Sequence, residues 1–75
     1  MYTIQYEATS GTHRMQEFDS KNRERLVGHL ARFRRPILAV YEQATPITKA
    51  IRAELAKLPD RALSQDARNF IRDRA

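Results

Sequence analysis

The sequence contains no cysteine and no tryptophan, and only two glycines and three prolines. The absence of cysteine excludes disulfide bonds and thiolate metal ligands. The two histidines, His13 and His29, lie far apart, and neither has a pair of carboxylates nearby at the spacing of metal ligands. We therefore expect no structural zinc and no other cofactor.

The chain also lacks a long apolar run. No stretch approaches the roughly 20 residues that a membrane-spanning helix requires. The first six residues, MYTIQY, do not have the charged and then apolar layout of a signal peptide. Together with the absence of cysteine, these features predict a cytoplasmic protein that makes no contact with a membrane.

The length of 75 residues allows one domain, which we expect to span residues 1–75 with a frayed end at residues 72–75. A domain this short buries only about 60% of the surface that its unfolded chain exposes. Small domains often gain stability from disulfides, metals or a partner subunit. Because disulfides are excluded and a metal is not expected, self-association as a homodimer is the expected extra source of stability.

Positive charge is concentrated in one segment of the chain. The formal net charge is +5, and the pI is about 10.2. Residues 20–35 contain six basic side chains against Glu24 alone, whereas the rest of the chain carries eight basic and eight acidic side chains. Arginines outnumber lysines 11 to 3, and the planar guanidinium group suits phosphate and carboxylate partners. The basicity is therefore a local patch.

Three segments have the pattern of β-strands. Residues 2–8 alternate between apolar and polar side chains, which predicts a half-buried strand. Residues 13–18 predict a second, antiparallel strand in which Met15 and Phe18 differ in parity, so that it contains a bulge or is an edge strand with one exposed apolar group. Residues 37–41 form a continuous apolar run, typical of a central strand buried on both faces, and predict a strand over residues 37–42.

A basic helix is predicted for residues 20–34. Asp19 or Ser20 can cap its start, and Pro36 ends it because the residue before a proline is pushed out of the helical region. Its apolar stripe consists of Leu26, Val27, Leu30 and Phe33.

Two further helices follow the third strand. Thr45-Pro46 is typical of a helix start and predicts a helix over residues 46–58, after which Ser64 caps a last short helix. The order β-β-α-β-α-α predicts a small α+β domain with a three-stranded sheet packed on helices. Two alternatives remain open: residues 37–43 can be helical, or residues 46–52 can pair with the third strand as a hairpin.

The candidate binding site is the polar side of the basic helix. Helical spacing places four residues opposite the apolar stripe, and two arginines follow at the end of the helix. These six residues are Lys21, Arg25, Gly28, Arg32, Arg34 and Arg35. A glycine inside a helix costs about 0.5–1 kcal/mol relative to alanine. Gly28 therefore indicates close approach of a phosphate backbone, flanked by arginines that neutralise it. The alternative is a solvated helix face.

Two polar residues lie among or beside apolar stripes. His29 borders the stripe of the basic helix, where we expect a half-buried residue at the edge of the core. Glu54 falls inside the apolar arc of the helix over residues 46–58. Since an unpaired buried carboxylate is costly, we expect Glu54 to reach the rim of the core or to pair with Arg23 or Arg34.

Catalytic motifs are absent from the sequence. We find no P-loop, nucleophile elbow, dinucleotide fingerprint or paired carboxylates. Residues 10–14, SGTHR, resemble the Gly-Ser-His stretch of messenger-RNA-cleaving toxins of the HicA type, in which a strand histidine serves as acid–base. The resemblance covers only these residues, and Thr12 replaces the serine. We therefore expect that the protein is not an enzyme.

Two functional classes remain. The first is a nucleic-acid-binding protein, such as a small regulator, that contacts the phosphate backbone through the basic helix. The second is a protein-binding inhibitor that directs its arginines at an acidic surface of a host complex. In its small size, basic charge, α+β pattern and lack of catalytic residues, the chain resembles accessory factors of phages and plasmids, including anti-CRISPR-type inhibitors.

Overall fold

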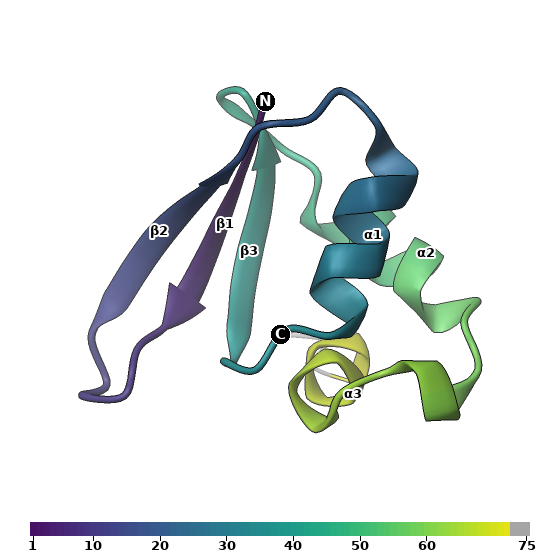
Figure 1. Ribbon diagram of the computed structural model, residues 1–75. Coiled ribbons are helices and arrows are strands. Elements are labelled where there is room, and N and C mark those ends of the chain that lie inside the picture. Colours follow the sequence, from purple (N-terminus) through teal and green to yellow (C-terminus); the bar gives the residue numbers. More distant parts are fainter. Residues whose placement is uncertain (73–75) are drawn as a thin grey trace.

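The computed structural model describes residues 1–72, which form a small α+β fold. Four antiparallel strands make one sheet in the order β2-β1-β3-β4, and the helices lie against one of its faces (Figure 1). The elements are β1 (Tyr2–Glu7), β2 (His13–Phe18), α1 (Arg23–Ala31), β3 (Ile37–Glu42), β4 (Thr45–Pro46), α2 (Thr48–Ala56), the 3-10 turn η1 (Asp60–Ala62) and α3 (Gln65–Arg72). The predicted class is confirmed, with one strand more than expected.

Strands β1 and β2 form a regular hairpin whose register runs from Tyr2 opposite Phe18 to Glu7 opposite His13. Gly11 in the connecting turn has a φ of 83°, a conformation that glycine adopts without steric cost. Strand β2 lies at the edge of the sheet, and Met15 is 62% exposed. The mixed parity in this segment is therefore explained by an edge strand with an exposed apolar side chain.

Strand β3 is covered on one face only. Ile37 and Val40 are buried beneath the helices, whereas Leu38, Ala39 and Tyr41 are half-buried. The expectation of a strand buried on both faces is wrong, because the helices all lie on the same side of the sheet (Figure 1). The bounds of this strand agree with the prediction, and its helical alternative is ruled out.

Helix α1 is shorter than the predicted span of residues 20–34. Its N-cap is Asn22, whose side-chain oxygen accepts a hydrogen bond from the Glu24 amide at 2.9 Å. The expected cap at Asp19 or Ser20 is therefore wrong. Ser20 instead accepts from the Asn22 amide at 3.0 Å, which shapes the turn before the helix. The helix ends at Ala31. Phe33, the last residue of the predicted apolar stripe, therefore lies in the loop after the helix, and its side chain is buried in the core.

The segment Thr45–Pro46 is strand β4 and not a helix start. Pro46 lies opposite Tyr41, at the outer edge of the sheet, where a proline removes no ladder hydrogen bond. The hydroxyl of Thr48 accepts from the Val40 amide at 3.1 Å and lies 3.3 Å from the Val40 carbonyl oxygen. This contact joins the start of α2 to β3. Of the hairpin alternative over residues 46–52, only Pro46 belongs to the strand that pairs with β3, and the helix occupies residues 48–56.

Helix α3 is attached to the end of α1 through Ser64. The Ser64 hydroxyl donates to the Phe33 carbonyl oxygen at 2.6 Å and accepts from the Ala67 amide at 3.1 Å. The Ser64 amide also donates to the Ala31 carbonyl oxygen at 2.7 Å. The predicted cap is confirmed. Of the expected frayed end, Arg72 belongs to α3, and residues 73–75 lie outside the described residues.

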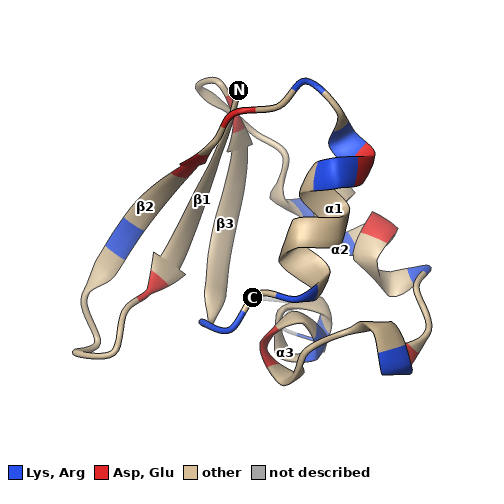
Figure 2. Ribbon diagram, in the orientation of Figure 1, with Lys and Arg blue, Asp and Glu red and all other residues tan. Residues whose placement is uncertain are grey.

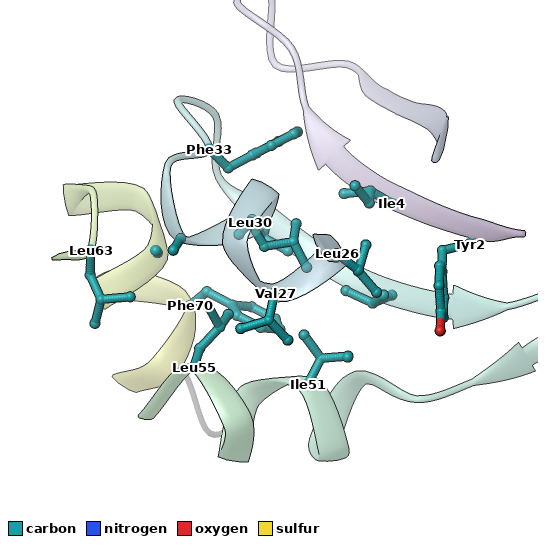
Figure 3. Packing of buried hydrophobic residues seen from close by; sticks show 14 residues of the cluster. Tyr2, Ile4, Leu26, Val27, Leu30, Phe33, Ile51, Leu55, Leu63 and Phe70 are labelled. Carbon is teal, nitrogen blue, oxygen red and sulfur yellow. The ribbon is translucent and has the colours of Figure 1, made fainter. Parts of the chain in front are cut away.

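The core fills the space between the sheet and the three helices (Figure 3). Phe70 on α3 and Leu30 on α1 are among its largest fully buried side chains. All buried side chains of the described residues are apolar: Tyr2, Ile4, Leu26, Val27, Leu30, Ala31, Phe33, Ile37, Val40, Ile51, Leu55, Leu63, Ala67 and Phe70.

Candidate nucleic-acid interface

The outer side of α1 carries a short basic row. Arg25, Gly28 and Arg32 follow one another at intervals of three and four residues and are all exposed. Arg32 is the C-cap, directly after the last residue of α1. The spacing places the three residues on one side of the helix, with the two arginines about 10 Å apart along its axis. The apolar residues of α1 face the opposite way into the core. The structure therefore brings these three predicted residues together on one surface.

The remaining predicted residues lie beyond the two ends of α1. Lys21 precedes the helix, whereas Arg34 and Arg35 follow it, and all three are exposed. Figure 2 shows basic residues gathered at both ends of α1, with an uncharged stretch between them. We define the six residues together as the α1 basic surface: Lys21, Arg25, Gly28, Arg32, Arg34 and Arg35. Its positive charges form two groups along the helix.

The fold does not require a glycine at position 28. A methyl group added there would meet no atom within 4 Å, and the backbone of Gly28 does not have a positive φ. Alanine would therefore fit and would favour the helix by about 0.5–1 kcal/mol. Packing within residues 1–72 thus gives no reason for this glycine.

The structure adds Arg61 to the C-terminal group. Arg32, Arg34 and Arg61 line an open hollow beside the end of α1, together with the first residues of α3. Asp66 also lines this hollow, and its carboxylate offsets part of the positive charge. Arg61 belongs to the η1 turn. No periodic pattern in the sequence connects it with α1, so sequence reasoning missed it.

Arg23 is set apart from the α1 basic surface by its own ion pairs. Its guanidinium lies 3.4 Å from a carboxylate oxygen of Glu42 and 3.7 Å from one of Glu54. A side-chain hydrogen bond with Tyr2 raises the pKa of Arg23, and the two carboxylates act in the same direction. The expected pairing of Glu54 with Arg23 is confirmed. Within residues 1–72 these are the ion pairs, so the cations of the α1 basic surface make none there.

The two histidines occupy different environments. His29 is half-buried, stacks on Phe18 with ring centroids 4.9 Å apart and meets the Phe33 ring edge-on at 5.6 Å. This agrees with the expected position at the edge of the core. Its buried Nε2 has no hydrogen-bond partner among the described residues. His13 is exposed at the start of β2, opposite Glu7 of β1.

The described part of the chain offers no group of three or more histidine and carboxylate side chains arranged to hold a metal ion. Among the same residues, no helix has both the length and the apolar character needed to cross a membrane. The α1 basic surface is therefore the feature on which the candidate site rests. The chain matches no family model, and no curated protein or solved structure is significantly similar to it.

Proposed function

We propose that the protein binds nucleic acid and that the α1 basic surface contacts its phosphate backbone. The observation that carries the proposal is the exposed row of Arg25, Gly28 and Arg32, whose arginines have no ion-pair partner within residues 1–72. Exposed arginines without a protein partner keep all their donors available for phosphate oxygens. The protein acts as a binding protein without a catalytic step, and a regulatory role fits such contacts.

The spacing of the row suits a nucleic acid. Duplex DNA carries one phosphate charge per about 1.7 Å of its axis, so two arginines about 10 Å apart along a helix can each contact a phosphate. Gly28 between them lets the helix backbone approach the nucleic acid without an intervening side chain. Phosphate contacts of this kind position a protein but do not read sequence. We therefore expect binding with little base preference.

Replacing Arg25 and Arg32 together by alanine tests this proposal. The double variant should bind a random DNA duplex more weakly, and the slope of log affinity against log salt should become shallower by about 1.8, or about 0.9 per lost phosphate contact. Fluorescence anisotropy over a series of salt concentrations measures this slope. Single-stranded DNA and single-stranded RNA are tested in parallel to identify the preferred form.

A matched control removes the same charge elsewhere. The variant Lys49→Ala/Arg72→Ala loses two exposed cations of α2 and α3 and should change affinity much less. Native-like circular dichroism of both variants confirms that they fold. Equal weakening in the two variants would show that net charge alone governs binding. No binding of the native protein at low salt would exclude the proposal and favour an inhibitor that uses these arginines on an acidic protein surface.

Substitutions of Gly28 separate the role of the glycine from that of the charges. Gly28→Ala should raise the free energy of unfolding by about 0.5–1 kcal/mol and leave binding nearly unchanged, because the added methyl group meets open space. Gly28→Leu keeps a folded helix but should weaken binding to every sequence, since its side chain separates the helix from the backbone of the nucleic acid. Urea denaturation and anisotropy measure the two effects. Unchanged binding by Gly28→Leu would rule out close approach at this position.

A second copy of the chain is the other partner that we propose, through the open edge of the sheet at β2. The geometry of that edge supports this second proposal and is described next.

A further inference from the structure

The outer edge of β2 is open along its whole length. The strand ends the sheet order, and no other part of residues 1–72 pairs with its outer side (Figure 1). Five of its six residues are exposed. Natural edge strands are usually protected by prolines, bulges or charged side chains, lysine above all. Strand β2 has no proline, lysine or bulge, and its charged side chains are Arg14 and Glu17.

The hydrogen-bond pattern between β1 and β2 identifies which backbone groups of β2 point to the open edge. In an antiparallel pair, opposite residues alternate between those that exchange hydrogen bonds and those that do not. The Ala8 amide donates to the Thr12 carbonyl oxygen at 2.8 Å, whereas the Glu7 amide donates toward β3, to the Pro36 carbonyl oxygen at 3.0 Å. Even-numbered residues of β2 therefore bond to β1. The amides and carbonyls of the odd-numbered residues point to the open edge: His13, Met15 and Glu17.

We propose that two copies of this chain join along β2 as an antiparallel homodimer whose two-fold axis passes beside Met15. In this register, Met15 lies opposite Met15 of the second copy, and His13 lies opposite Glu17 on each side of the axis. All three pairs are of the hydrogen-bonded kind, so every outward-pointing amide and carbonyl of β2 finds a partner. The two four-stranded sheets become one continuous sheet.

The side chains of these pairs complement one another. The imidazole of His13 in each copy can donate an N–H to the carboxylate of Glu17 in the other copy. The two-fold axis therefore gives two such contacts. Within residues 1–72, the large apolar side chains that are exposed are Met1 and Met15, and Met15 is the more exposed of the two. In the dimer, the Met15 side chains of the two copies pack against each other at the axis. The two neighbouring symmetric registers, about Gln16 and about Arg14, would place Met15 opposite Glu17 or opposite His13. Opposite polar and apolar side chains make both registers less favourable.

The symmetry also has a consequence for the helices. A two-fold axis between antiparallel strands stands perpendicular to the sheet, so the helices of both copies lie on the same side. The dimer therefore presents two α1 basic surfaces related by that axis. Dimer formation itself does not depend on nucleic acid, so the two proposals are tested separately.

Sedimentation equilibrium with the 75-residue chain, without nucleic acid, tests the dimer. The native chain should sediment as a dimer at micromolar concentration. Met15→Pro removes an outward-pointing amide but none that bonds to β1, and it should raise the dissociation constant at least about tenfold. The control Met15→Thr keeps the backbone amide, and threonine favours the strand conformation. Its dissociation constant should therefore rise only a few-fold. A native monomer at high micromolar concentration would overturn the proposal, as would unchanged dimerisation of Met15→Pro.

A cysteine substitution tests the register even where the proline variant fails to fold. Residues opposite each other in a hydrogen-bonded pair have Cα atoms about 5.5 Å apart, within the range that a disulfide spans. Because the native chain has no cysteine, Met15→Cys should form a cross-linked dimer on mild oxidation. Gln16→Cys should not, since its two thiols lie two residues out of register, with Cα atoms about 8 Å apart. Cross-linking of Gln16→Cys alone, or of neither variant, would contradict the proposed axis.

Discussion

Replacing Phe70 with alanine is expected to lower the free energy of unfolding by about 3–5 kcal/mol. Phe70 is 2% exposed and fills the centre of the core where α3 meets α2 and the sheet (Figure 3). Its ring also lies beneath the guanidinium of Arg52, which is 4.6 Å from the ring centroid. Arg52 donates to the Phe70 carbonyl oxygen at 2.8 Å as well. Truncation would remove the apolar contacts and the cation–π contact together, and leave a cavity.

Small domains have a total stability of about 5–15 kcal/mol, so this single change should leave a large part of the molecules unfolded at moderate temperature. Urea denaturation followed by circular dichroism measures the loss. Ile71→Ala on the same helix is the matched control, because Ile71 is half-buried and should lose only about 1–2 kcal/mol. Equal losses in the two variants would show that α3 does not pack as described.

Replacing Leu30 with alanine is expected to lower the free energy of unfolding by about 2–5 kcal/mol. Leu30 is fully buried on the inner side of α1. Alanine is a better helix former than leucine, so the loss would come from packing and not from helix propensity. The measurement is again the shift of the urea midpoint, with the slope of the transition unchanged.

Arg25→Ala on the outer side of α1 is the control for Leu30→Ala. Arg25 is exposed and makes no ion pair within residues 1–72, so its removal should change stability by no more than about 0.5 kcal/mol. The two variants therefore separate the inner side, which stabilises the fold, from the outer side, which we propose to bind nucleic acid. A large loss of stability in Arg25→Ala would contradict this division of α1.

Local patterns in the sequence predicted most of the fold. The strands at residues 13–18 and 37–42 have the predicted bounds, and β1 ends one residue earlier than expected. Period-two alternation and apolar runs are strong signals because they reflect which side of a sheet faces the core. The cap at Ser64 was predicted correctly for a similar reason, since a serine before an apolar periodic segment satisfies the free amides of a helix start.

The errors occurred where several residues compete for one role. Three side chains that can cap a helix, Asp19, Ser20 and Asn22, lie before α1, and only the path of the chain from β2 places Asn22 at the cap. Thr45-Pro46 has the chemistry of a helix start and also fits the edge of a sheet. Pairing with β3 decided between these possibilities. Such pairing depends on residues that are neighbours in space, which a local pattern does not contain.

The sequence by itself determined the α+β class, the apolar side of α1 and the position of the basic residues on its other side. These properties follow from residue type and helical or strand period, both of which are local. Only the tertiary structure decided that Glu54 pairs with Arg23 and not with Arg34, and that Glu42 joins this pair. It also decided that Arg61 joins the C-terminal arginines, and that β2 is an edge strand without a bulge. Each of these depends on segments far apart in the sequence, whose contacts arise when the core packs and the order of the strands is established.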